Sequence, residues 1–370
     1  MSAQKQISWL VIMLCFLVIG TAAAQTSQPD SQPIPITLGD TITDTLQPSE
    51  AKIYQVNLVD ADLPVDIVLF SQEDAVIRGT RAEGHPIPPI DRMFGYGFEV
   101  LTILPGGIIP ATIEVRINSI VESTEYSLSI LPTDPQVSEA PIPGEQVKRW
   151  DEIEIGTASR PRKAIVPYLL YVPEDYDRAQ TYPLIFFMHG YGETGTRLDF
   201  LKTQVLPELI ENGQDFPFMI ISPQVTYGED WASVSNRSAL FIQHLQTEFP
   251  IDPNRIYIAG LSMGGSGAWH FALTFPDVPA AVVSMAGYYS YGSARVPDTI
   301  CDISAIPFWV VHSEQDESVN FNWEAALVDG VRDCGGEVEF TTYPDATHEQ
   351  TFERGFADPT LYTWLLEQAK

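Results

Sequence analysis

The sequence predicts a mostly parallel β-sheet covered by helices on both faces, preceded by a small domain made of β-strands alone. Three observations predict this fold class. From residue 147 onward, apolar strand-like runs alternate with helical patterns, as in parallel sheets buried on both faces. Between residues 36 and 131, short β-rich runs follow one another with little helical periodicity. Finally, a buried strand at residues 255–259 turns abruptly into a helix, with Ser262 at the bend.

The first 24 residues have the pattern of an export signal. Lys5 provides a positive start, residues 9–19 form an apolar run too short to span a bilayer, and small residues at 22–24 offer a cleavage site. We therefore exclude residues 1–24 from the fold and expect a secreted or periplasmic protein. Cys15 lies within the apolar run, and a retained membrane anchor is the alternative interpretation.

The charge of the chain limits its partners. It carries 49 acidic and 20 basic residues, a net charge of −29. Such a surface argues against binding nucleic acid or, once the signal is removed, anionic membranes, and it favours a neutral substrate. No cysteine or histidine spacing typical of a metal site is present, so we expect no metal and no cofactor.

Two cysteines remain after removal of the signal, Cys301 and Cys334. An even pair in an exported chain suggests one disulfide bond. Two free buried thiols are the alternative.

The predicted N-terminal domain spans residues 36–131 and follows a proline- and serine-rich leader at residues 25–35. The stretches LGDTITDTLQPSEAKIYQVNL and STEYSLSI resemble the accessory β-sandwich modules, such as the prepeptidase C-terminal kind, that accompany secreted bacterial hydrolases. The resemblance implies a β-sandwich with a spacer or substrate-targeting role. We interpret His85 as a loop residue. Strands are expected at residues 36–38, 51–58, 65–70, 97–103, 111–117 and 126–130.

Residues 132–146 have the composition of a linker, and residues 147–370 form the predicted second domain. Its expected strands are residues 151–155, 164–171, 184–188, 218–221, 255–259, 281–285, 308–312 and 337–342. Its expected helices are residues 200–212, 233–247, 263–275, 321–333 and 350–368.

The bend after residues 255–259 reads Gly260-Leu261-Ser262-Met263-Gly264. This G-x-S-x-G pattern between a strand and a helix is typical of the nucleophile elbow of α/β-hydrolases. The glycines let strand and helix approach closely around a strained turn. We predict Ser262 as the nucleophile and the Met263 N–H, at the positive end of the helix, as an oxyanion donor. A serine that only caps the helix is the alternative.

A glycine-rich loop, HGYGETG, follows the strand at residues 184–188. In α/β-hydrolases the corresponding loop supplies the second oxyanion donor. We assign that donor to the Tyr191 N–H, with a neighbouring residue as the alternative. His189 is expected to shape this loop and not to act as the base.

The acid and the base must follow the nucleophile along the chain. Asp316, after the strand at 308–312, is the predicted acid, with Glu314 and Glu317 as alternatives. His348 is the last histidine in the chain and the predicted base; an exposed loop histidine that caps the last helix is the alternative. We expect His244 and His270 to be packing or surface residues.

Residues 168–364 resemble the secreted esterase and predicted-peptidase branch of the α/β-hydrolases. The motifs are PYLLYVPEDYD, YPLIFFMHGYGETG, ISPQ and DPNRIYIAGLSMGGSGAWHFALTFPD. This branch is similar to feruloyl and acetylxylan esterases, polyhydroxybutyrate depolymerases and the catalytic domain of prolyl oligopeptidases. The resemblance implies a serine carboxylesterase acting on carbohydrate-linked or polymeric esters. A serine peptidase and a non-catalytic binding protein on the same fold are the alternatives.

The stretch from residue 287 to residue 306 is too short for a helical lid domain. We therefore expect an open site that accepts esters on bulky molecules. Trp231 and Tyr288 are predicted to bind substrate, together with Tyr289 and Tyr291. Packing in the core is the alternative for these aromatic residues.

Overall fold

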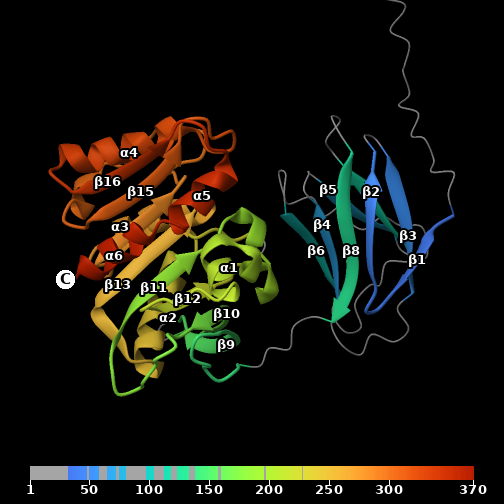
Figure 1. The fold of residues 1–370 in the computed structure, drawn as a ribbon, viewed down its shortest axis with the longest axis horizontal. Coiled ribbons are helices and arrows are strands. Elements are labelled where there is room, and N and C mark those ends of the chain that lie inside the picture. Colours follow the sequence, from blue (N-terminus) through green and yellow to red (C-terminus); the bar gives the residue numbers. More distant parts are fainter. Residues whose placement is uncertain are drawn as a thin grey trace, which may run out of the picture.

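The computed structural model contains two units, one built from the first third of the chain and one from the remainder (Figure 1). It describes residues 32–47, 50–57, 65–71, 75–80, 97–103, 112–117, 123–132, 138–156, 160–195, 197–226 and 228–370. The predicted export signal and His85 lie outside the described residues. Within these ranges, no helix is both long enough and apolar enough to cross a lipid bilayer.

The N-terminal unit consists of two four-stranded sheets, ordered β1-β3-β7-β5 and β2-β8-β4-β6. One hydrophobic cluster joins them, since it contains Tyr54 and Ile113 from the first sheet and Ile67 and Leu128 from the second. The strands are β1 (Ile34–Thr37), β2 (Thr41–Leu46), β3 (Ala51–Asn57), β4 (Val65–Ser71), β5 (Ala75–Thr80), β6 (Gly97–Ile103), β7 (Thr112–Ile117) and β8 (Thr124–Pro132).

Two of these strands, β2 and β5, were not predicted from the sequence. β2 reads TITDTL and is mostly exposed or half-buried. Its threonines and aspartate do not give the hydrophobic pattern from which a strand is predicted. It is held by six residue pairs to β8. Pairing with a distant partner, and not local hydrophobicity, makes this segment a strand.

The second unit contains one eight-stranded sheet, ordered β16-β15-β14-β13-β11-β12-β10-β9. β9 and β10 pair antiparallel. The strands β11 to β16 pair with one another in parallel. This confirms the predicted mostly parallel sheet. The strands are β9 (Gln146–Glu154), β10 (Lys163–Tyr171), β11 (Tyr182–Met188), β12 (Met219–Pro223), β13 (Ile251–Leu261), β14 (Ala281–Met285), β15 (Phe308–Ser313) and β16 (Val338–Tyr343).

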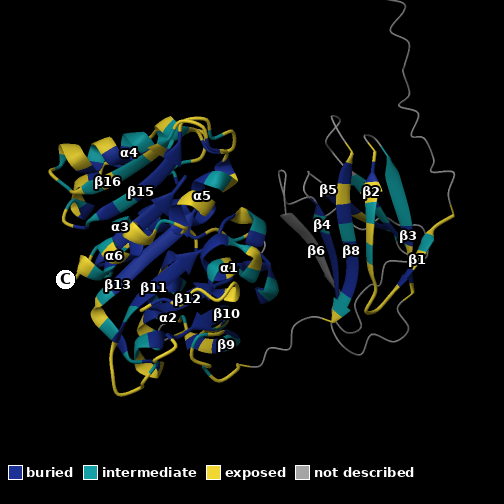
Figure 2. Cartoon of the chain, viewed as in Figure 1, coloured by how far each residue is buried: buried dark blue, intermediate teal, exposed yellow. Residues whose placement is uncertain are grey.

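Helices cover both faces of this sheet, and the central strands are buried between them (Figure 2). Successive strand residues point to opposite faces, so Phe186 packs in one hydrophobic cluster and Ile185 in another. The first cluster includes α2 (Ser235–Glu248), α3 (Met263–Thr274) and α4 (Phe321–Asp333); the second includes α1 (Val205–Glu211), α5 (His348–Phe356) and α6 (Pro359–Glu367).

The single helix predicted at residues 350–368 is wrong in one respect, because the chain breaks it into α5 and α6. Pro359 has no N–H and stands at the first position of α6, where proline is tolerated. Asp358 caps α6 by accepting the Thr360 N–H at 2.9 Å. The predicted helix at 200–212 is likewise divided, into the 3₁₀-helix Leu198–Thr203 and α1.

The predicted disulfide between Cys301 and Cys334 is confirmed, with 5.3 Å between the two Cα atoms. It ties the 3₁₀-helix Ile300–Ile303 to the end of α4. The two cysteines are 33 positions apart, and closing a loop of that length stabilises the folded state by about 3–4 kcal/mol in the chain-entropy model.

The two units touch beside the HGYGETG loop. Arg197, two residues beyond this loop, donates to Asp66 Oδ2 at 3.0 Å and to the Pro132 carbonyl at 2.7 Å. The Asp66 side chain is fully buried. Val68 of the N-terminal unit and Phe200 of the second unit also pack against each other. The N-terminal unit therefore contacts the segment that leads away from the predicted oxyanion loop.

Candidate active site

Ser262 lies at the turn between β13 and α3. β13 ends at Leu261 and α3 begins at Met263, and the serine between them has φ 52° and ψ −117°. A positive φ is strained for a residue with a side chain. Gly264 permits the turn, because a Cβ at that position would lie 1.9 Å from the Met188 carbonyl oxygen. The turn thus presents the Ser262 hydroxyl at the carboxyl end of β13.

The structure brings the three predicted triad residues together. The Nε2 atom of His348 lies 3.0 Å from Ser262 Oγ, and its Nδ1 atom lies 2.6 Å from Asp316 Oδ2. Because the carboxylate accepts, Nδ1 carries the hydrogen and Nε2 is left to accept the serine proton. These side chains come from the turn after β13, the loop after β15 and the first residue of α5.

The alternatives to Asp316 do not reach the imidazole. Glu314 is exposed, and Glu317 accepts only the backbone N–H of His348, at 3.4 Å. Asp316 is further held by the backbone N–H groups of Ser318 and Val319, which donate to its Oδ1 at 2.9 and 2.7 Å.

His348 does not cap α5, which was the alternative interpretation. Thr347 is the N-cap, and its hydroxyl accepts the Gln350 N–H while the Gln350 side chain accepts the Thr347 N–H. This capping box fixes the direction in which the chain enters α5. It therefore also fixes the side of the helix from which the imidazole projects.

The two predicted oxyanion donors stand at helix starts beside the serine. Met263 opens α3, and Tyr191 opens the 3₁₀-helix Tyr191–Glu193. N–H groups at such positions have no partner within their own helix. Gly190 brings the second loop close, since a Cβ there would lie 3.9 Å from Ser262 Cβ.

His189 shapes this loop, as predicted. Its Nε2 accepts the Val225 N–H at 3.1 Å, so its Nδ1 carries the hydrogen and donates to the Gly190 carbonyl at 2.6 Å. Burial lowers the pKa of His189 to about 4, which keeps it neutral. Its bond holds the Gly190–Tyr191 peptide in one orientation and turns the Tyr191 N–H away from the imidazole.

Trp231 and Tyr288 have different surroundings. Trp231 is 1% exposed and donates its indole N–H to the His189 carbonyl at 2.9 Å. This burial does not fit the predicted substrate-binding role, so we assign Trp231 to the support of the loop. Tyr288 is half-buried, and its ring contacts those of Tyr291 and Trp323. Burial raises the pKa of Tyr288 to about 12, so it is a neutral phenol.

Two further histidines of the second unit, His244 and His270, lie in other contacts. His244 Nε2 is 3.4 Å from Asp151 Oδ2, and His270 Nε2 is 2.9 Å from the Tyr289 carbonyl. Neither contacts the serine. This agrees with the packing or surface roles expected for both.

Glu193 was not singled out by sequence reasoning, although it lies within the HGYGETG motif. It is 7% exposed, and its Oε2 atom has no hydrogen-bond partner. Burial raises the pKa of Glu193 to about 7, against the lowering effect of the Gly190 and Glu193 N–H groups. In the unfolded chain the pKa of Glu193 is about 4.5. The oxyanion loop thus contains an acid that titrates near neutral pH.

We expect Glu193 to make the folded state less stable as the pH rises. Between about pH 4.5 and 7 the folded protein retains a proton that the unfolded chain has lost, so stability is full below this window and falls through it. Replacing Glu193 by glutamine should remove up to about 3 kcal/mol of this fall. Urea unfolding of both proteins at pH 5 and pH 8 measures the free energy of unfolding. If this free energy changes by the same amount between the two pH values in the wild type and in the variant, the prediction is contradicted.

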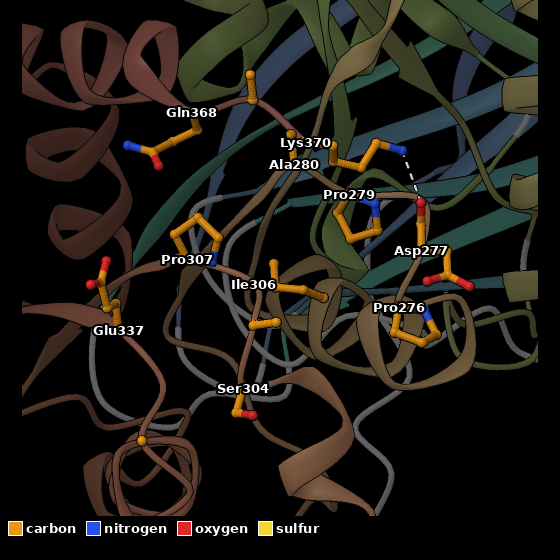
Figure 3. A pocket seen from close by; sticks show the side chains of 13 residues that line it. Pro276, Asp277, Pro279, Ala280, Ser304, Ile306, Pro307, Glu337, Gln368 and Lys370 are labelled. Carbon is orange, nitrogen blue, oxygen red and sulfur yellow. Dashed lines mark hydrogen bonds between the residues drawn. The ribbon is translucent and has the colours of Figure 1, made fainter.

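A surface hollow of about 590 Å³ lies at the other edge of the sheet (Figure 3). It is lined by the segments that precede β14, β15 and β16, including Ala280, Pro307 and Glu337, and by the chain end. Lys370 reaches across it and donates to the Asp277 carbonyl at 2.8 Å. Since parallel strands start at this edge, the hollow is remote from Ser262.

Comparison with known proteins agrees with this geometry. Residues 200–355 match the phospholipase/carboxylesterase family model. The second unit has the α/β-hydrolase fold. The chain is 26% identical over 204 residues to a bifunctional acetylxylan esterase/xylanase of Neocallimastix patriciarum, covering 53% of this chain and 27% of that protein. It is also 26% identical over 199 residues to acyl-protein thioesterase 1 of Neurospora crassa, covering 46% and 81%.

Among solved structures, the chain resembles a thermostable esterase with a TM-score of 0.47 and 18% identity, covering 92% of this chain and all of that one. The chain spans only about a quarter of the acetylxylan esterase/xylanase, 27% of its length. The sequence-based resemblance to the esterase branch of the α/β-hydrolases is confirmed by the family match and by the two relatives found by sequence.

Proposed function

We propose that this protein is a serine carboxylesterase that hydrolyses carboxylic esters through an acyl-enzyme intermediate. The observation that carries the proposal is the line of hydrogen bonds from Ser262 through His348 to Asp316 at a strained elbow. A hydroxyl, a neutral imidazole and a buried carboxylate in this order are the groups that acyl transfer requires.

In the proposed reaction, His348 Nε2 removes the Ser262 proton while Oγ bonds to the acyl carbon. The Met263 and Tyr191 N–H groups stabilise the oxyanion. His348 then returns the proton to the leaving alcohol, whose C–O bond breaks. Water attacks the acyl group in the same way, and the proton it loses to His348 passes back to Ser262 Oγ. Asp316 orients the imidazole and stabilises its charged form.

We further propose that the substrates are esters on carbohydrates or polymers. The connection between β14 and β15 contains only the short 3₁₀-helix Ile300–Ile303, which supports an open site. Tyr291, 68% exposed, contacts Trp323 and Tyr288, and such ring faces suit neutral sugar or phenolic groups. The named relatives include an acetylxylan esterase.

A panel of substrates tests the proposal. Hydrolysis of acetyl, feruloyl and longer acyl esters of p-nitrophenol and of xylan should be compared with hydrolysis of peptide amides. Turnover of esters alone is expected. Preferred cleavage of amides would replace the esterase proposal by a peptidase, and failure of a fluorophosphonate to label Ser262 in the folded protein would favour a non-catalytic binding protein.

We also propose that the protein is exported and that its N-terminal unit is an accessory β-sandwich. The charged and apolar pattern of residues 1–24 and the disulfide support export. Expression of the full chain in a Gram-negative host should yield periplasmic or secreted protein beginning at Gln25. Recovery of uncleaved protein from the membrane fraction would instead indicate a retained anchor.

A further inference from the structure

Two buried ionisable side chains next to Asp316, those of His312 and Glu324, take no part in the proposed reaction. His312 lies near the end of β15, and Glu324 lies in the first turn of α4. Neither side chain is exposed to solvent, and His312 Nδ1 is 2.7 Å from Glu324 Oε2. Burying two charges is costly unless both are fully bonded.

The partners of His312 favour its charged form. The Val319 carbonyl, 3.0 Å from Nε2, can only accept, so Nε2 carries a hydrogen. The other oxygen of this carboxyl group, Glu324 Oε1, accepts from the Trp269 indole at 3.0 Å and from the Ser284 hydroxyl. Burial alone would lower the pKa of His312, but its bonds to Asp316 and Glu324 raise it to about 10. His312 is therefore an imidazolium at neutral pH.

This cation lies against the proposed catalytic acid. His312 Nε2 is 3.5 Å from Asp316 Oδ2, the same oxygen that accepts from His348. Val319 links the two residues a second time, because its N–H donates to Asp316 Oδ1 while its carbonyl accepts from His312. Burial alone would raise the pKa of Asp316, but the neighbouring His312 and His348 side chains hold it well below its usual range.

We infer that His312, kept positively charged by Glu324, is a positioning residue that holds Asp316 ionised and directed at His348. The inference rests on the proposed function. The resulting line is Glu324, His312, Asp316, His348 and Ser262, in which charges of opposite sign alternate up to the neutral base.

Among the described residues, the surroundings of His312 contain no second cation that could replace it. The charged groups that face His312 are Glu324 from α4 and Asp316 from the loop that follows β15. Phe321 packs edge-on against the ring, and the paired residue on β16 is Thr342. Removing the imidazolium therefore leaves Asp316 with His348 as its only cationic partner once the reaction charges that base.

Replacing His312 by glutamine should move the acidic limb of the kcat/KM profile upward by about one pH unit. The change removes a positive charge next to Asp316, so the carboxylate and the His348 imidazole both take up protons more readily. At pH 8, kcat should fall about 10-fold with an unchanged KM, because the acid is less well oriented. Glu324→Gln should move the limb in the same direction, since His312 then loses the anion that keeps it charged.

A double variant separates positioning from mere stability. H312Q/E324Q replaces two charges by two amides that can bond each other, so it should regain the melting temperature lost by either single variant and keep the shifted limb. Tyr168→Phe is a matched control, because it removes a buried 2.6 Å bond to Asp151 far from Ser262 and should lower stability without moving the limb. A wild-type profile in H312Q or in the double variant would overturn the inference.

A second readout does not depend on activity. In protein labelled with ¹⁵N-histidine, both nitrogens of His312, assigned by their absence in H312Q, should show the shifts of a protonated imidazolium from pH 6 to pH 8. A neutral His312 would overturn the inference even in an active enzyme. A wild-type protein that hydrolyses no ester but shows a charged His312 would instead refute the proposed function.

Discussion

Replacing Ser262 by alanine should lower kcat/KM for p-nitrophenyl acetate by about 10⁵–10⁶-fold, the loss known for serine hydrolases without their nucleophile. The Ser262 hydroxyl lies 3.0 Å from His348 Nε2. Alanine has no hydroxyl and cannot form the acyl-enzyme. The fold should be unaffected, because the strained turn depends on Gly260 and Gly264 and on the Ser262 N–H bond to the Met285 carbonyl. Steady-state kinetics with active-site titration by a fluorophosphonate measures the effect.

Ser266 provides the matched control for this experiment. It is a buried serine one turn further along α3, and Ser266→Ala should leave kcat/KM within about threefold of the wild type. Residual activity above about 1% in Ser262→Ala, with the melting temperature unchanged, would show that another group carries the chemistry.

Replacing Asp316 by asparagine should lower kcat by about 10⁴-fold, as in the corresponding chymotrypsin-type variant. The Asp316 carboxylate accepts the Nδ1 hydrogen of His348 at 2.6 Å. An asparagine amide that donates to Nδ1 instead would move the imidazole hydrogen to Nε2, where it blocks removal of the serine proton. Substrate binding is not touched, so KM should change little. The kinetic constants at pH 8 test this.

Glu314 is the control for the charge change. It lies two residues from Asp316 and is exposed, so Glu314→Gln removes the same charge from the same loop without touching His348. We expect it to change kcat less than threefold, since exposed charges are strongly screened. If Asp316→Asn keeps more than a tenth of the wild-type kcat while Glu314→Gln does not, the acid has been assigned to the wrong residue.

Local patterns were sufficient for much of the fold and for the candidate site. The parallel strands β12 and β14 are mostly apolar and buried throughout, and the glycines around Ser262 are required by contacts within a few ångströms of the turn. Asp316 and His348 could be named because parallel strands end at one edge of the sheet, so the loops that follow them meet there.

Other features depend on contacts between residues far apart in the chain, and no local pattern contains them. Trp231 was predicted to bind substrate, with core packing as the alternative, and it is buried against His189. The polar strand β2 exists because β8 pairs with it. Glu324 carries no motif of its own; it matters because α4 packs its carboxylate against His312. Hydrophobic periodicity and glycine placement are properties of neighbouring residues, whereas the burial and charge of a side chain depend on which distant elements fold against it.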